Sequence, residues 1–256
     1  MAYLDHNASS PLLPEVCEHL RASADTFWAN PDSLHAEGLR ARALADTSRA
    51  RVASALGAKP SEVIFTSGAS EANQSALSHM ARSSKAIVTL ASEHPAVLAP
   101  LAALGVPLRV LGVNRQGLVD IDELSEALKG SCGLVAMGAN NESGVIQDLE
   151  AIGACVEAHG VDWHCDAVQL ARWGAIDFGS GFAEHVSSLA LSAHKLGGPQ
   201  GVGALVMRDG DFVPLIRGGP QQKGRRAGTL PVSAISAFAL AMEQVPLSTE
   251  RVGALR

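Results

Sequence analysis

The stretch "SSLALSAHKLGGPQGVGAL" (residues 187–205) places a hydrophobic run directly before a histidine, a lysine and a series of glycines. The runs "HVSSLALS" and "VGALVMR" that flank this lysine segment both predict buried β-strands. A lysine after an apolar strand is ordinarily a solvated terminator, and glycines there are ordinary turn residues. The alternative is that Lys195 is a nucleophile in a pocket where residues without side chains let the backbone come close. The stretch alone leaves both interpretations open.

Outward from this stretch, apolar runs alternate with segments of helical composition along most of the chain. Further strands are predicted over 62–67, 86–92, 107–113, 133–139 and 161–167. Helices are predicted over 33–57, 70–82, 95–105, 120–130, 149–160 and 231–245. This alternation predicts an α/β fold with a mostly parallel, mixed sheet and helices on both faces. Functional groups in such sheets gather beyond the carboxyl ends of the strands, so we expect a site there.

Composition and charge exclude several classes of protein. The chain has 256 residues, of which 47% are hydrophobic and 18% charged, as in a globular protein. A net charge of −6 without a basic stripe argues against nucleic acid or a membrane as a partner. The N-terminus shows no signal-peptide pattern, and no apolar run approaches the roughly 20 residues that span a bilayer. We therefore expect a cytoplasmic protein.

The spacing of the cysteines predicts reduced thiols, because it contains no CxxC pair and a chain of this length does not need a disulfide framework. They are Cys17, Cys132, Cys155 and Cys165. We expect all four to be small buried side chains rather than nucleophiles. In "DWHCDAVQ", strand alternation puts His164 and Asp166 on one face and Cys165 on the other, so these three are not expected to share a metal ion. No metal site is predicted.

Two predicted strands run into turns that open helices. In "IFTSGASEAN", backbone N–H groups and the Ser67 and Ser70 hydroxyls could cradle a phosphate at the helix N-terminus. The simpler interpretation is that Ser70 only caps the helix. In "SEHPAV", His94 could likewise be a cap or a surface residue, or it could lie on an aromatic ring and move protons near neutral pH.

Two further strand ends carry amides and a carboxylate. Asn140 and Asn141 are typical of a turn, and they could also hydrogen-bond a polar ring substituent. Asp166 ends an apolar strand, with Gln169 three residues later. A carboxylate there is costly to bury unless a cation pairs with it, either at the surface or as a protonated ring nitrogen. Together with Lys195 among glycines, these groups match the requirements of pyridoxal 5'-phosphate, which needs a lysine and a carboxylate that pairs with its pyridinium.

Eight ordered blocks of this chain resemble the class V aminotransferases, and within them most closely the cysteine desulfurases. The blocks are "YLDHNASSPLLPEV", "NPDSLHAEGLRAR", "EVIFTSGASEANQSAL", "SEHPAVL", "NNESGVIQDL", "HCDAVQ", "LSAHKLGGPQGVGAL" and "RRAGTLPV". They extend in register from Tyr3 to about Met242. The resemblance implies a fold-type I enzyme that depends on pyridoxal phosphate and works as a homodimer.

The resemblance also implies a role for ten residues. Lys195 matches the family's Schiff-base lysine, and His94 matches its ring-stacking acid–base histidine. Asp166 matches the pyridinium partner, and Gln169 and Asn141 match cofactor-contacting amides. Ala69, Ser70, Ser192 and His194 match the phosphate site, and Thr229 matches a threonine that reaches the phosphate of the neighbouring subunit. Ser70 stands where the family commonly has threonine, and it keeps the hydroxyl.

The family pattern implies a division of the chain into three parts. Residues 1–12 would form an arm near the active site, 13–245 the large cofactor-binding domain, and 246–256 the start of a connection to a small domain not present in this chain. In the family that domain carries a sulfur-accepting cysteine and a substrate-binding arginine. No counterpart of either is found in this sequence.

By resemblance, the activity would be removal of sulfur from L-cysteine to give L-alanine and a protein-bound persulfide, for sulfur transfer or iron–sulfur cluster assembly through an acceptor protein. Selenocysteine lyase or aminotransferase activity would use the same residues. A non-catalytic protein that binds pyridoxal phosphate is a further alternative, because the cysteine loop is missing. A Rossmann- or flavodoxin-like domain is less suitable, because no GxGxxG follows the first strand.

Overall fold

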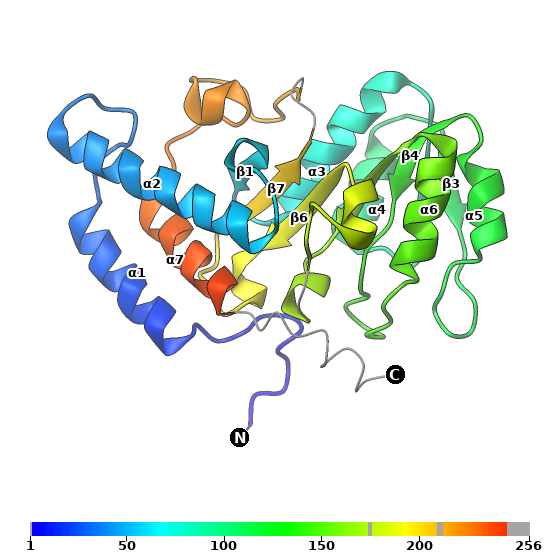
Figure 1. The fold of residues 1–256 in the computed structure, drawn as a ribbon, viewed down its shortest axis with the longest axis horizontal. Coiled ribbons are helices and arrows are strands. Elements are labelled where there is room, and N and C mark those ends of the chain that lie inside the picture. Colours follow the sequence, from blue (N-terminus) through cyan, green and yellow to red (C-terminus); the bar gives the residue numbers. More distant parts are fainter. Residues whose placement is uncertain (1, 174–175, 209–211, 245–256) are drawn as a thin grey trace.

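The computed structural model describes residues 2–173, 176–208 and 212–244, in which a twisted sheet runs through the middle of the molecule (Figure 1). The seven strands lie in the order β1-β7-β6-β5-β4-β2-β3. They are β1 (Val63–Thr66), β2 (Ala86–Leu90), β3 (Leu108–Leu111), β4 (Ser131–Val135), β5 (Asp162–Asp166), β6 (Ser188–Ser192) and β7 (Gly203–Met207). Only β7 runs antiparallel to its neighbours, β1 and β6. The predicted mixed, mostly parallel α/β sheet is thus confirmed.

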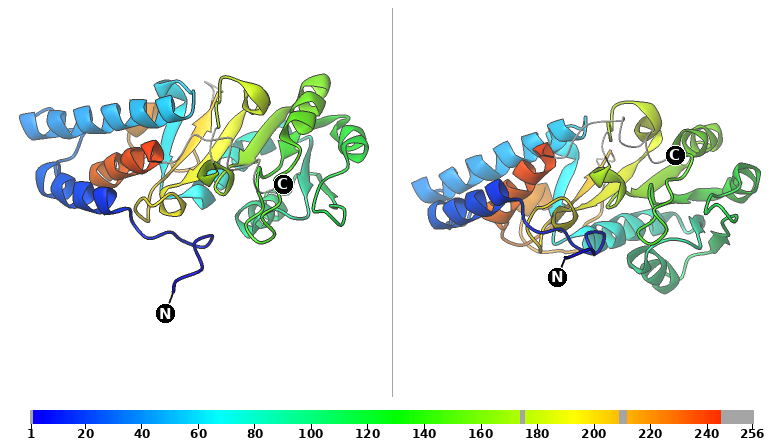
Figure 2. Two further views of the ribbon diagram at one scale, coloured as in Figure 1. Left: turned by 60° about the horizontal axis from the view of Figure 1, so that its bottom comes forward. Right: turned by 90° about the horizontal axis from the view of Figure 1, so that it is seen from below.

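The described residues include seven α-helices, of which α1 packs on α7 and the others lie along the sheet (Figures 1 and 2). They are α1 (Pro14–Thr26), α2 (Ala36–Ala55), α3 (Ala69–Met80), α4 (Pro95–Ala103), α5 (Ile121–Leu128), α6 (Leu149–His159) and α7 (Val232–Glu243). Side chains of α2, α5, α6 and α7 form one core cluster with one face of the sheet, whereas α3 and α4 pack in separate clusters. In β1, Val63 and Phe65 join the first cluster while Ile64 joins the α3 cluster. Strand alternation thus supplies apolar side chains to both helical layers.

The strand predicted over 133–139 differs most from the structure. Strand β4 covers Ser131–Val135, and the apolar run beyond it leaves the sheet. Ala139 instead forms an isolated antiparallel bridge with Ile146, closing the loop that holds the two asparagines. Periodicity could not reveal this exit, because the loop residues are as apolar as the strand.

The glycine at position 197 is explained by the N-terminal segment. Its φ of 79° is left-handed, and a Cβ there would lie 2.6 Å from Cγ of Leu13. The Leu13 N–H also donates to the Gly197 carbonyl at 3.0 Å. A side chain at 197 would therefore push away the segment that leads from residues 2–12 into α1.

The described part of the chain has neither a membrane-spanning helix nor a cluster of metal-binding side chains. None of its helices is long and apolar enough to cross a membrane. In the same residues, no group of three or more His, Cys, Asp or Glu side chains could hold a metal ion. The predicted connection over 246–256 lies outside the described residues.

Candidate active site

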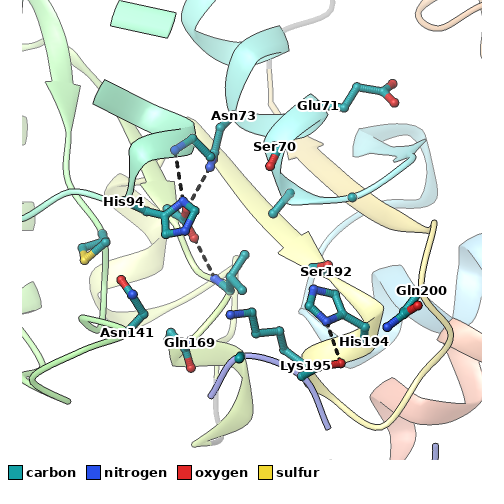
Figure 3. A pocket seen from close by; sticks show the side chains of 18 of the residues that line it. Ser70, Glu71, Asn73, His94, Asn141, Gln169, Ser192, His194, Lys195 and Gln200 are labelled. Atoms are coloured by element: carbon teal, nitrogen blue, oxygen red, sulfur yellow. Dashed lines mark hydrogen bonds between the residues drawn. The ribbon is translucent and has the colours of Figure 1, made fainter. Parts of the chain in front are cut away.

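A cavity of about 540 Å³ opens beyond the carboxyl ends of β5 and β6 and beside the start of α3 (Figure 3). Nine of the ten predicted site residues line it. They are Ala69, Ser70, His94, Asn141, Asp166, Gln169, Ser192, His194 and Lys195. Thr229 is exposed and is not part of this lining. Residues that are up to 126 positions apart in sequence therefore meet in one place, because parallel strands end at the same edge.

One end of the cavity is suited to an anion. Helix α3 starts at Ala69 after Gly68, and no side chain caps its first turn. Its free N–H groups and the positive end of the helix dipole therefore face the cavity beside Ser70 and Ser192. The Ser67 N–H is not available, because it donates to Oε2 of Glu71 at 2.8 Å. A phosphate at this end would therefore have to be bound without the Ser67 amide.

The backbone around this end is packed too closely for larger residues. A Cβ on Gly203 would lie 2.4 Å from the Leu191 carbonyl oxygen and 2.8 Å from the Cα of Gly68. Glycine in β7 therefore lets the loop before α3 approach the end of β6. This is the physical reason for one of the glycines that follow Lys195.

Lys195 lies in a single helical turn, Ala193–Lys195, directly after β6. Its Nζ donates to the carbonyl oxygen of Asn7 at 2.6 Å. Burial is the main effect that lowers the pKa of Lys195 below its ordinary value, and the nearby Arg172 lowers it further, while Asp166 and Asp5 oppose the shift. A larger neutral fraction makes this amine a better nucleophile and base than a solvated lysine.

Asp166 is the last residue of β5 and is 7% exposed. Its Oδ2 accepts from Nδ2 of Asn73 at 2.8 Å, and its Oδ1 accepts from the Val168 N–H at 3.1 Å. The pKa of Asp166 is raised above its ordinary value because burial outweighs the two hydrogen bonds and the nearby His94 and Lys195, which lower it when they are protonated. The carboxylate thus has two donors from the protein and would be stabilised further by a cation in the cavity.

His94 caps helix α4 and also reaches the cavity. Its Nδ1 accepts from the Ala96 N–H at 3.0 Å, which makes it the N-cap of α4, and its ring also lines the cavity (Figure 3). Because Nδ1 accepts a hydrogen bond, the neutral ring carries its proton on Nε2. His94 can therefore donate from Nε2, and taking up a second proton requires release of the cap.

The two asparagines divide their roles. Oδ1 of Asn140 accepts from the N–H groups of Glu142 and Ser143, at 3.0 and 2.8 Å, and organises the loop. Asn141 is left to line the cavity. Gln169 also lines it, and its Nε2 donates to the Asn7 carbonyl oxygen at 3.0 Å.

The N-terminal segment closes one side of the cavity. Ser9 Oγ lies 3.2 Å from Nδ1 of His194, and Ala8 and Ser9 are part of the lining. Burial, together with the charge of Lys195, lowers the pKa of His194 and so favours its neutral ring. The sequence blocks pointed to this segment, but not to the contact between its Asn7 carbonyl and Lys195.

Asn73 is the functional residue that sequence reasoning missed. It lies one helical turn after Ser70 in α3, so both face the cavity. The signal was the spacing of Ala69, Ser70 and Asn73 on one helix face beside a buried carboxylate. Composition gave no reason to prefer it over other amides.

The cysteines only partly follow the prediction. Cys155 and Cys165 are buried, whereas Cys132 is half-buried in β4 and Cys17 is exposed on α1. The expectation of burial is therefore wrong for Cys17, which lies on the solvent side of an amphipathic helix. None of the four lines the cavity. Cys165 packs in the core cluster opposite the face that carries Asp166.

The donor set suits pyridoxal phosphate. The uncapped start of α3 with Ser192 and His194 could hold its phosphate, and the buried Asp166 could face its pyridinium. Lys195 could bind its carbonyl carbon, and Gln169 and Asn141 are placed for its polar substituents. A buried carboxylate and a lysine with a lowered pKa in one cavity are the pair that this cofactor requires.

Comparison with known proteins agrees with this geometry. The sequence pattern of "Aminotransferase class-V" matches residues 2–252. The chain belongs to the class V aminotransferase family. Pyridoxal 5'-phosphate is the cofactor of this family, and within it the chain is cysteine desulfurase-like, as the sequence blocks predicted.

Named relatives of this class V chain include the cysteine desulfurase IscS of Dictyoglomus turgidum, 38% identical over 99% of this chain and 67% of the relative. A cysteine desulfurase of Trichormus azollae is 39% identical over 94% of this chain and 62% of the relative. The solved structure of SspA in complex with cysteine is 33% identical with a TM-score of 0.91, covering 97% of this chain and 74% of that one. The chain thus spans about two thirds or less of these two curated relatives.

Proposed function

We propose that this chain provides the cofactor-binding site of an enzyme that transfers sulfur from L-cysteine. The observation that carries the proposal is that Lys195 and Asp166 line one cavity, together with an uncapped helix N-terminus. The relatives named as cysteine desulfurases, and a structural neighbour solved with cysteine, support this substrate. In the overall reaction the C–S bond of L-cysteine breaks, and a thiol takes the sulfur to give a persulfide and L-alanine.

Four residues of the chain would carry the proton transfers and the binding. The Lys195 amine, with its lowered pKa, would take and return the proton at Cα of the substrate. His94 would donate from Nε2 to a substrate atom in the cavity while Nδ1 stays on the Ala96 N–H. When bound, pyridoxal phosphate supplies an electron sink for the electron pair at Cα. Asp166 supports that role by pairing with the ring nitrogen, and Ser192 would bind phosphate.

We also propose the three features that the sequence implied beyond the site itself. A homodimer is supported by Thr229, which is exposed outside its own cavity, and by the exposed Trp28 and Leu34, at 75% and 83%. A sulfur-acceptor protein fits the finding that no cysteine lines the cavity, so the accepting thiol must come from another segment or another protein. Free thiols fit a cytoplasmic location.

The three-part division of the chain is proposed on the same basis. Residues 1–12 act as an arm, because Asn7 and Ser9 contact site residues of the large domain. The large domain would extend to 245, of which residues up to 244 are described. A connection over 246–256 would lead into a small domain, as in the family.

The deciding experiment is a visible absorption spectrum of the purified full-length protein with pyridoxal phosphate, compared with that of Lys195→Ala. The parent should become coloured by covalent attachment, and the variant should lose this band while keeping the fold by circular dichroism. Lys59→Ala, at an exposed position, is the control and should behave like the parent. An unchanged band in Lys195→Ala refutes the assignment.

Mixing two inactive variants tests the dimer. If Thr229 serves the neighbouring site, a hybrid of Lys195→Ala and Thr229→Ala subunits contains one site with both residues intact. Co-refolding should therefore restore part of the activity on L-cysteine, measured as alanine formed. No recovery, in spite of hybrid dimers seen by native mass spectrometry, would refute the shared site.

A further inference from the structure

A chain of three buried polar side chains extends from Asp166 away from the cavity. Asn73, on α3, and His164, on β5, are both 0% exposed, and Ser188, on β6, is 2% exposed. Nδ2 of Asn73 donates to Asp166 Oδ2 at 2.8 Å, and Oδ1 of Asn73 lies 3.0 Å from Nε2 of His164. Nδ1 of the same ring lies 2.8 Å from Oγ of Ser188. Only Asn73 and Asp166 belong to the cavity lining.

If Asp166 is ionised, the contacts fix the position of each proton along this row of hydrogen bonds. An ionised Asp166 only accepts, so the Asn73 amide must turn its NH₂ group toward it. The Asn73 oxygen then faces His164, and His164 must carry its proton on Nε2. Nδ1 is left as an acceptor for the Ser188 hydroxyl. Burial lowers the pKa of His164 to about 4, so the ring is neutral at neutral pH.

The reversed orientation of the Asn73 amide requires a different charge on Asp166. If Asn73 turned its oxygen toward Asp166, that carboxyl would have to carry a proton, and His164 would have to place its own proton on Nδ1. The tautomer of His164 therefore follows the ionisation of Asp166, although the two side chains are not in direct contact. A half-reversed chain would leave a buried polar atom without a partner, which is costly.

We propose that Asn73, His164 and Ser188 are positioning residues that hold Asp166 ionised and fix the orientation of its carboxylate toward the cavity. This deepens the proposed function and rests on it, since the ionised carboxylate is the group that would face the cofactor's ring nitrogen. His164 acts through Asn73 and touches neither substrate nor cofactor.

Other titratable groups around Asp166 either favour its ionised form or disfavour a second negative charge beside it. His94 and Lys195 lower its pKa when they are protonated. Burial and the charge of Asp166 raise the pKa of Glu93 well above its ordinary value, and burial does the same for the Cys165 thiol. Both shifts disfavour a second negative charge beside Asp166.

The first test is the tautomer of His164, measured by ¹⁵N NMR of the protein at neutral pH with and without pyridoxal phosphate. We expect Nε2–H and an unprotonated Nδ1 in both samples. An Nδ1–H tautomer or a charged ring would overturn the proposal. The sample without cofactor makes this test independent of the proposed function, whose failure would show as a lack of cofactor binding.

The second test compares two substitutions at His164. In His164→Gln the side-chain NH₂ takes the place of Nε2–H and can still donate to Asn73, whereas His164→Leu cannot. We expect His164→Leu to weaken pyridoxal phosphate binding by about tenfold and to move the acid midpoint of the visible band to higher pH. His164→Gln should stay within about twofold of the parent, because the donor remains.

Ser75→Ala is the matched control, since Ser75 is a buried serine of the same helix outside this chain of hydrogen bonds. It should leave both the affinity and the acid midpoint unchanged. Equal behaviour of His164→Gln and His164→Leu would refute a role for the donor, because a purely structural ring would not be rescued by glutamine. If neither variant folds, the tautomer of the parent still decides.

Discussion

Two cavities of this protein are rich in charged side chains, yet only one is built for a ligand. The active-site cavity is lined by Lys195 and Asp166, and the second, of about 440 Å³, is lined by Arg49, Arg225 and Lys223. In the second, the arginine donors are used by the protein backbone. Arg49 Nη1 donates to the Val63 carbonyl oxygen at 2.5 Å, and Arg225 Nη1 donates to that of Ser61 at 2.5 Å.

Side chains that line the second cavity cover an edge of the sheet. Strand β1 is an outer strand, and Gln222 takes the place of a further strand by bonding both the N–H and the carbonyl of Phe65, each at 2.8 Å. Side chains that satisfy an edge strand prevent it from pairing with other chains. The cations of the second cavity are therefore explained by contacts within the fold. The active-site cavity differs because the first N–H groups of α3 have no side-chain cap.

The largest expected effect separates the two lysines. Lys195→Ala should lower turnover of L-cysteine by the full-length protein about 10³-fold, because a positioned proton carrier is lost. Lys223→Ala, in the second cavity, should change it by less than about twofold, since its side chain is exposed. The measurement is alanine formation under saturating pyridoxal phosphate. Comparable losses in both variants would contradict the assignment of the active site to the first cavity.

The next effect concerns stability rather than chemistry. Gln222→Ala would leave the N–H and carbonyl of Phe65 without these partners, and should lower the free energy of unfolding by about 2 kcal/mol or more. Urea denaturation measures this, with the exposed Gln116→Ala as a control that should stay within about 0.5 kcal/mol. The visible band with pyridoxal phosphate should be unchanged. An unchanged stability of Gln222→Ala would show that water replaces the two hydrogen bonds of Gln222 to Phe65.

The pH dependence of the free energy of unfolding tests the burial of His164 beside the active site. The folded pKa of His164, about 4, lies below its unfolded value of about 6.5, so the unfolded chain takes up a proton first as pH falls. This depressed pKa therefore costs stability progressively from about pH 6.5 down to about 4, by up to about 1.4 kcal/mol per pH unit. His164→Gln should be less sensitive to pH in this window. Parallel curves for parent and variant would contradict the shift.

The smallest effect tests how the N-terminal segment is held. Gly197→Ala should cost about 1 kcal/mol or more, because φ is positive and the new Cβ meets Leu13. Gly201→Ala is a matched control with a φ of 78° and open space around it, so it isolates backbone strain from the clash. Hydrogen exchange of residues 5–12 should accelerate only in Gly197→Ala. Equal exchange in both variants would show that Leu13 does not anchor the segment.

The sequence predicted much of the site because its groups follow strand ends. Asp166, Ser192 and Lys195 come directly after apolar runs, and such ends meet at one edge of a parallel sheet. Asn73 could not be predicted in the same way, because its role depends on the angle at which α3 packs over β5. Nor could the exposure of Cys17, which depends on which face of α1 turns toward α7.

The sequence alone was enough to predict the succession of strands and helices along the chain and the family, since periodicity and ordered motifs are local properties of the chain. Only the tertiary structure decided where protons and donors go. It placed the Asn7 carbonyl on Lys195, capped α4 with His94 and connected Asp166 to His164 through Asn73. Hydrogen bonds require atoms within about 3 Å of one another, and packing alone brings residues so far apart in sequence to that distance.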